Sequence, residues 1–385
     1  LLQKPSHLYL HLDLSRNCLL DILIEDPDAG EKFSLLMPLL AHVDRWRQLR
    51  FGGYSRKDLR PILAAFKNLR LKKLETVHLF CQESQDEAQD EDPEGGFHSE
   101  DSDEENFTSG RMQLFRGGTP CLKELDIRSI TALPNTLNHL THLNLHNDAF
   151  ARALWSYSEF THILRRLESL IHLSMVGPIV SLEAVTAQRT NITPNLRSLK
   201  FTTEEDENQF REYEEGEGDP YFVAILALFT NTQVSRLYFL QPPSSSLPPI
   251  LDGMRLGGLR FHHVTELYWG IDFGRRDDAV IFIRAFPAIQ RFYLMDTGSN
   301  ILNTLIKSSS AKKLWRYMHT IHLDDPNLPK ARQLVESRIK AGWPLRCLRM
   351  RLPKPRGHQS DLDWLVNALE VLWVPYDNRI YWGPE

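Results

Sequence analysis

The chain repeats one short pattern of apolar and polar positions, apolar-x-x-apolar-x-apolar, along most of its length. The copies are LLDILI (19–24), WRQLRF (46–51), LETVHL (74–79), LKELDI (122–127), LTHLNL (140–145), LIHLSM (170–175), LRSLKF (196–201), VSRLYF (234–239), VTELYW (264–269), IQRFYL (289–294), MHTIHL (318–323), LRCLRM (345–350) and LEVLWV (369–374). Alternate side chains of an extended strand point to opposite faces. Each copy therefore predicts a short strand with a buried apolar face and an exposed face formed by the x residues.

The spacing of these strands predicts the architecture. If the fourth residue of each copy is its anchor, the gaps from Leu125 to Leu372 run from 18 to 38 residues. Their average of about 27 lies within the roughly 20–29 residues of leucine-rich repeats. One such strand cannot bury its apolar face alone, whereas parallel strands stacked with returning helices share a continuous core. Helical periodicity predicts those helices within 33–46, 159–170, 220–230, 279–289, 331–339 and 361–369.

We therefore predict an α/β fold, an irregular leucine-rich-repeat solenoid in a single unit over residues 1–385, with parallel strands on the concave face and helices on the convex face. The alternative is an ordinary doubly wound α/β domain, since strands alternating with helices also indicate that class. The repeated units are more numerous and shorter than a doubly wound domain needs.

Charge is distributed unevenly along the chain. The 385 residues include 45 Lys and Arg against 50 Asp and Glu, for a net charge of −5. Residues 83–105 hold twelve acids and no Lys or Arg, and residues 204–219 hold nine acids and one Arg. Without these two segments the chain would carry about +15, a basic body that could attract acidic partners.

Both acidic segments fall between repeats. High charge and low apolar content predict that 82–110 is a disordered acidic insertion and that 204–219 is a shorter acidic loop. Two interpretations remain open. The segments are simply solvated loops, or they regulate binding, through phosphorylation of Ser84, Ser99 or Ser102 or by screening a basic concave face.

The sequence does not favour a membrane protein, a secreted protein or an enzyme. No apolar run approaches the ~18 residues of a membrane span, and the first residues lack the order of a signal peptide. The four cysteines are far apart without a C-x-x-C, which fits a reducing compartment, cytoplasmic or nuclear. Phosphate-binding glycine loops and nucleophile elbows are absent. We expect no catalytic residues and no cofactor.

Metal and nucleic-acid binding were the remaining possibilities. His139, His142 and His146 lie close in sequence, but no Cys completes a ligand set and the only carboxylate nearby is Asp148. We therefore expect exposed strand histidines and no metal site. The scattered Lys and Arg form no recognition-helix, RNP-like or zinc-finger pattern, so nucleic acid is the less favoured partner.

The exposed x residues of the later repeats predict the working surface. They are rich in Tyr and Arg, which are enriched in binding hot spots. The predicted protein-binding residues are Arg236, Tyr238, Tyr268, Arg291, Tyr293, His322, Arg349 and Arg351. A second interpretation, equally open, is that these side chains only stabilise neighbouring strands through cross-strand pairs. Substitution of Tyr293 or Arg291 by Ala separates the two, since only the first interpretation predicts lost binding without lost stability.

Several segments carry a family resemblance. LDLSRNCLLDILIED, LAHVDRWRQLRF, LETVHLF, LFRGGTPCLKELDI and ILRRLESLIHLSM occur in this order. They resemble F-box leucine-rich-repeat proteins of mushroom-forming (basidiomycete) fungi. The most specific pieces are HVDRWR (42–47) and LFRGGTP (114–120).

The resemblance implies a substrate receptor of a cullin–RING ubiquitin ligase. In that family an N-terminal F-box docks on a Skp-type adaptor, and the repeats hold the protein to be ubiquitinated. The three-helix F-box is expected before residue 1 and is missing from this sequence, so no adaptor-binding residue can be assigned. The expected function is protein binding on the concave face, linked to adaptor and cullin only through that F-box. The alternatives are a scaffold or inhibitor without a ligase link, and a nucleic-acid-binding protein.

Overall fold

The computed structural model describes most of the chain. The described residues are 5–25, 33–54, 56–81, 113–147, 154–182, 193–202, 221–240, 246–270, 273–295, 299–308, 314–324, 327–351 and 359–374. The predicted acidic insertions at 82–110 and 204–219 lie outside them. The chain divides into two compact units, Leu1–Ala184 and Val185–Glu385. The single solenoid over 1–385 stays a prediction.

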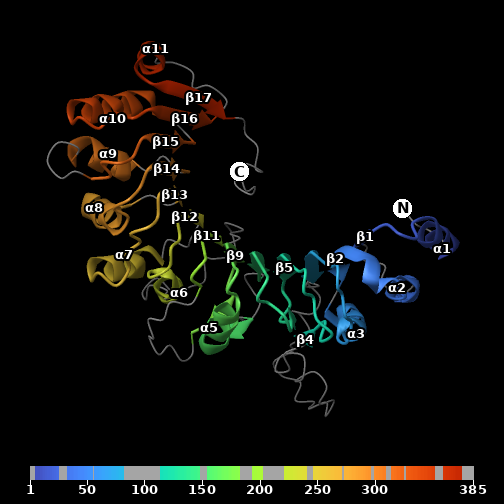
Figure 1. The fold of residues 1–385 in the computed structure, drawn as a ribbon. Coiled ribbons are helices and arrows are strands. Elements are labelled where there is room, and N and C mark those ends of the chain that lie inside the picture. Colours follow the sequence, from blue (N-terminus) through green and yellow to red (C-terminus); the bar gives the residue numbers. More distant parts are fainter. Residues whose placement is uncertain are drawn as a thin grey trace, which may run out of the picture. The chain divides into compact units, whose positions relative to one another are not determined.

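The first unit contains a sheet of parallel strands that pair in their order along the chain (Figure 1). These strands are β1 (Leu20–Glu25), β2 (Trp46–Tyr54), β3 (Thr76–Cys81), β5 (Glu124–Arg128), β7 (His142–His146) and β9 (His172–Val176). The helices are α1 (Pro5–Leu14), α2 (Phe33–Leu40), α3 (Arg56–Phe66) and α5 (Tyr157–Arg166), with a 3₁₀ turn η2 (Val43–Arg45). Two small parallel pairs are β4 (Gln113–Leu114) with β6 (Leu133–Pro134), and β8 (Trp155–Ser156) with β10 (Val180–Ser181).

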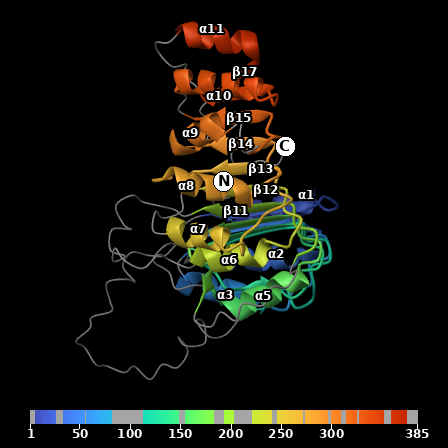
Figure 2. The same cartoon turned by 90° about the vertical axis from the view of Figure 1, so that its left-hand side faces the viewer.

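The second unit repeats strand and helix more regularly. Its parallel strands are β11 (Ser198–Thr202), β12 (Arg236–Leu240), β13 (Glu266–Trp269), β14 (Arg291–Leu294), β15 (Thr320–Leu323), β16 (Cys347–Arg351) and β17 (Glu370–Val374). Its helices are α6 (Tyr221–Phe229), α7 (Leu247–Arg255), α8 (Arg276–Ala285), α9 (Ser299–Ser308), α10 (Leu328–Lys340) and α11 (Gln359–Ala368). Helices α7 to α10 lie side by side in one layer, which faces the viewer in Figure 2.

The anchors of the sequence repeat lie side by side within each unit. In the second unit Leu199 pairs with Leu237, which pairs with Leu267, and the series continues through Phe292, Ile321 and Leu348. In the first unit Leu125 pairs with Leu143, which pairs with Leu173. The fold is therefore α/β with parallel strands and intervening helices, as the repeat predicts, and it is compatible with a solenoid.

The last strand corrects the predicted frame by one residue. Leu348 pairs with Val371, and Met350 pairs with Trp373. Leu372, the predicted anchor, lies opposite Arg349 and is 37 % exposed. Because side chains alternate along a strand, this shift of one residue exchanges the two faces. Trp373 therefore shares the side of the buried Met350, not the exposed face on which the sequence pattern placed it.

Aromatic side chains fill the interior of the second unit between sheet and helices. Phe239 of β12 contacts Phe222 of α6 with ring centroids 5.3 Å apart, and Trp269 of β13 contacts Phe282 of α8 at 4.3 Å. All four rings are at most 5 % exposed. Burial of such large rings is the main source of stability in a core of this kind. This burial also fixes which face of each strand points to the helices. The residues that alternate with the buried ones, Tyr238 and Tyr268 among them, point to the opposite face.

Local sequence features set individual element ends. Helix α5 begins with a capping box, in which Ser156 accepts from the backbone N–H of Glu159 and the Glu159 carboxylate accepts from that of Ser156. Gly177 follows β9 at a φ of +74°, where an added Cβ would lie 1.9 Å from the Asn147 carbonyl oxygen. Only glycine fits that position.

No helix in the described part of the chain is long and apolar enough to cross a membrane.

Candidate functional site

The eight predicted binding residues all lie on one face of five adjacent strands, β12 to β16. Strand pairing places Tyr238 beside Tyr268, Tyr268 beside Tyr293, and Tyr293 beside His322. We call these four residues the aromatic row. The ring centroids are 4.0 Å apart for Tyr238 and Tyr268 and 3.8 Å apart for Tyr268 and Tyr293, with nearly parallel planes. His322 follows at 5.6 Å from Tyr293.

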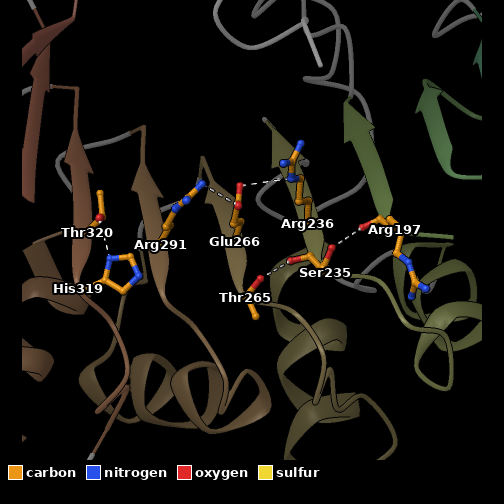
Figure 3. A network of polar contacts seen from close by, with 8 residues as sticks. All are labelled: Arg197, Ser235, Arg236, Thr265, Glu266, Arg291, His319 and Thr320. Carbon is orange, nitrogen blue, oxygen red and sulfur yellow. Dashed lines mark hydrogen bonds and ion pairs between the residues drawn. The ribbon is translucent and has the colours of Figure 1, made fainter. Parts of the chain in front are cut away.

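A charged row runs beside the aromatic row, nearer the start of the strands. Arg236, Glu266 and Arg291 pair with one another in register. Glu266 lies between the two guanidinium groups (Figure 3). Its Oε1 accepts from Nη1 of Arg291 at 2.9 Å, and its Oε2 lies 3.5 Å from Nε of Arg236. One carboxylate is therefore shared between two cations, and the row keeps a net positive charge.

A second ion-paired group lies at the other end of β15 and β16. Asp324 accepts from Nη1 of Arg351 at 3.0 Å, and its other oxygen lies 3.0 Å from Nε2 of His322. The side chains of His322 and Asp324 are 6 % and 7 % exposed. A buried carboxylate held by two donors is well ordered, so His322 is fixed at the end of the aromatic row.

The predicted residues differ in exposure. Tyr293 is 6 % exposed and His322 is 5 % exposed, so both are buried. Arg236, Tyr238, Tyr268, Arg291, Arg349 and Arg351 are half-buried. The stacking favours the interpretation that the row stabilises neighbouring strands. Tyr238, Tyr268 and the four arginines nevertheless remain partly exposed, so a partner can still contact them. Substitution of Tyr293 by Ala would remove packing as well, so it cannot separate the two interpretations by itself.

Burial shifts several ionisation equilibria on this face. Burial raises the pKa of Tyr268, and the neighbouring Tyr238 and Tyr293 raise it further. The pKa of Tyr238 is also raised, chiefly by burial. Lys200 of β11 pairs with Tyr238 in register and is 7 % exposed. Burial lowers the pKa of Lys200 to about 7. Tyr238 and Tyr268 therefore remain neutral at physiological pH, while Lys200 titrates near it.

The alternating pattern does not single out the residues directly before the strands, Arg197, Ser235, Thr265, Gln290, His319 and Arg346, which we call the outer line. The carbonyl groups of Arg197, Ser235 and Thr265 in the outer line accept from the backbone N–H groups of the first residues of the next strands, Arg236, Glu266 and Arg291. Arg197 and Arg346 are exposed there, and His319 is half-buried with Nδ1 3.0 Å from Oγ1 of Thr320 (Figure 3). These side chains occupy the first x position of each copy, and aligning the repeats at that position would have revealed them.

The histidines of the first unit do not form a metal site within the described residues. His142 stacks on His172 of the neighbouring strand with ring centroids 4.4 Å apart, and its Nδ1 lies 2.9 Å from Oγ1 of Thr141. His139 is exposed. His146 is only 6 % exposed, so the expectation of two exposed histidines on this strand is wrong for His146.

Comparison with protein-family models and with curated proteins finds no significant match.

Proposed function

We propose that the face of β12 to β16 binds another polypeptide. The observation that carries this proposal is the row of three stacked tyrosines bordered by half-buried arginines on one continuous sheet face. Tyr and Arg offer large contact area with directed hydrogen bonds and dominate binding hot spots. Because stacking already orders the rings, binding a partner would cost these tyrosines little further side-chain entropy.

We propose further that the repeat is of the leucine-rich class. The support is the sequence interval of about 27 residues between anchors and the pairing of those anchors on successive parallel strands, each followed by a helix in the second unit. Within that class, a face formed by the x residues of the strands is the face open to a partner. The role needs no catalytic residue, cofactor or metal in this chain.

The resemblance to F-box leucine-rich-repeat proteins supports a more specific proposal, substrate recognition for a cullin–RING ubiquitin ligase in the cytoplasm or nucleus. In that role the face of β12 to β16 would hold the substrate. Contact with a Skp-type adaptor would require F-box residues, which no position of this sequence matches. The alternative is a scaffold or inhibitor that binds protein by the same face and recruits no ligase.

Site-specific photo-crosslinking tests the protein-binding role. A benzophenone amino acid at Tyr268 probes the face, and the same group at Ile339 of α10, which is 47 % exposed, probes the helix layer as a control. We expect defined polypeptide adducts from the first position and not from the second. Equal patterns from both positions, or no adduct from Tyr268, would count against the proposal.

Affinity capture of the longest product of the gene tests the ligase link. Co-purification of a Skp-type adaptor and a cullin supports the receptor role, and their absence in the presence of a crosslinked partner favours the scaffold or inhibitor. Nucleic-acid binding instead predicts a steep fall of affinity with salt, and a flat salt dependence excludes it.

A further inference from the structure

Arginines recur on every second strand at the start of the β12–β16 face. Arg236 begins β12, Arg291 begins β14, and Arg346 directly precedes β16. The side chains of Arg236 and Arg291 are 32 % and 41 % exposed, and Arg346 is exposed. Since adjacent strands lie ~4.8 Å apart, Arg236 and Arg291, which stand in register, are separated by about 9.6 Å along the sheet. Arg346 lies one residue before Cys347, the position in register with them, so it stands slightly farther from Arg291. We call these three residues the arginine ladder.

The strands between the arginines carry different chemistry. Glu266 on β13 lies between Arg236 and Arg291 and is 14 % exposed. His319, before β15, follows Arg291, and its imidazole lies within the electrostatic influence of both Arg291 and Arg346. The charged residues of the outer line and the first strand positions of β11 to β17 are Arg197, Arg236, Glu266, Arg291, Arg346 and Glu370. The described surface at this edge is therefore positive, and within β12 to β16 a carboxylate or an imidazole lies on the strand between successive arginines.

We propose that the arginine ladder binds an acidic polypeptide segment whose carboxylates recur every third residue. This inference rests on the proposed protein-binding function and names the class of partner. A polyproline II segment has three residues per turn and a rise of 3.1 Å per residue, so side chains at i, i+3 and i+6 project from one side about 9.3 Å apart. That repeat matches the separation of the in-register Arg236 and Arg291, and the long side chain of the exposed Arg346 spans the offset of one residue.

Glu266 distinguishes this partner from a nucleic acid. A single strand presents a negative charge at every phosphate and would bring charge against Glu266 as well as against the arginines. A polypeptide can place an uncharged residue there, between two acids. Arginine donates to carboxylates in a fork geometry, and Arg291 keeps Nε and Nη2 for a ligand while Nη1 holds Glu266.

The test uses the whole chain and two fluorescein-labelled peptides of identical composition, measured by fluorescence anisotropy at low salt. The periodic peptide is Glu-Pro-Ala-Glu-Pro-Ala-Glu, and the block peptide places its three Glu residues together. We expect the periodic peptide to bind at least tenfold more tightly. Equal binding of both peptides would overturn the proposed spacing.

Variants locate the binding site. Arg346→Gln and Arg236→Gln are each expected to weaken the periodic peptide about three- to fivefold, and Arg346→Lys to restore part of the loss. Arg284→Gln on α8 makes the same change of charge on an exposed helix residue and should leave binding unchanged. Losses equal to that control would overturn the assignment to the arginine ladder.

Two further readouts complete the test. Bound carboxylates near Arg291 and Arg346 should raise the pKa of His319. NMR titration of histidine-labelled protein measures this pKa, and an unchanged pKa at saturation with peptide would contradict the proposed location. If oligo(dT) binds more tightly than the periodic peptide and loses affinity in the same variants, the partner is a nucleic acid and the proposal fails. If neither ligand binds while crosslinking at Tyr268 captures a polypeptide, protein binding stands and the acidic partner is wrong.

Discussion

Replacement of Arg338 by Met should destabilise the second unit by about 3 kcal/mol. Arg338 of α10 is 1 % exposed. Its Nη2 donates to the carbonyl groups of Trp315 and Met318, both at 3.0 Å, and its Nε donates to that of Trp343 at 3.0 Å. A charged hydrogen bond contributes roughly 1.5–3 kcal/mol, and loss of the donor leaves each buried carbonyl group unsatisfied. One side chain thus joins the helix to the chain segments on either side of it.

Desolvation of the guanidinium offsets part of this gain. Burial lowers the pKa of Arg338 to about 10, and each pKa unit by which it falls corresponds to about 1.4 kcal/mol. Methionine removes that penalty, of about 3 kcal/mol, together with three bonds of combined value about 6 kcal/mol. The difference predicts the net loss stated above. Arg338→Lys keeps a charge but not the fork geometry, so we expect a loss of similar size.

Urea unfolding followed by tryptophan fluorescence measures the effect, since Trp315 is 2 % exposed and belongs to the same contact. With a slope of about 3 kcal/mol/M, the midpoint of the second unit should fall by about 1 M. Lys340→Met, at an exposed position of the same helix, should change stability by less than about 0.5 kcal/mol. A loss below about 1 kcal/mol for Arg338→Met would refute the reasoning.

Three other predictions concern ionisation and backbone geometry. Because burial lowers the pKa of Lys200 to about 7, the unfolded chain binds one more proton than the folded chain between about pH 7 and pH 10. Relative to Lys200→Met, the free energy of unfolding of the wild-type protein should rise by about 1.4 kcal/mol per pH unit in that window. Urea midpoints that change with pH equally in both proteins would contradict this. Burial, Arg291 and Arg346 lower the pKa of His319, so Arg346→Gln should raise that pKa in an NMR titration without any ligand. An unchanged pKa would show that Arg346 lies too far from His319 to influence its ionisation. Gly177→Ala puts a Cβ 1.9 Å from a carbonyl oxygen at positive φ, and should cost at least about 2 kcal/mol of the first unit's stability in thermal unfolding; a smaller loss would show that the chain relaxes there.

The sequence predicted the strand anchors well, because an apolar residue between two polar ones can be placed on the buried face of its strand in only one way. In LTHLNL, Leu143 can only face the core, and it is 1 % exposed. LEVLWV is ambiguous, since Val371, Leu372, Trp373 and Val374 are all apolar. Pairing with β16 decides that frame, and a single sequence does not contain this information.

Some helices were missed where proline weakens the helical signal. Helix α3 contains Pro61 in its interior, and α7 begins with prolines after Leu247. Proline removes a backbone donor, so local propensity argues against a helix at both places. In α3, Leu59, Leu63 and Phe66 are each at most 1 % exposed, and this tertiary burial outweighs the local preference.

The candidate site was predictable in its residues and their shared face but not in their partners. Alternation alone places Tyr238, Tyr268 and Tyr293 on one side of the sheet. That Tyr293 is buried, and that Glu266 holds two arginines, depends on register between strands 25 to 30 residues apart. The burial of Tyr293 and the shared Glu266 carboxylate therefore follow from the pairing of neighbouring strands and not from any one strand's sequence.

Strand pairing without a register shift from β11 to β16 has an evolutionary consequence. Duplication or loss of one strand–helix unit would lengthen or shorten the core and the face together, by one strand spacing of ~4.8 Å. Inserting a unit between Arg236 and Arg291 would widen their separation by that step. Descendants of such a gene would thus differ in the width of this face in discrete increments, while every remaining strand kept its pairing.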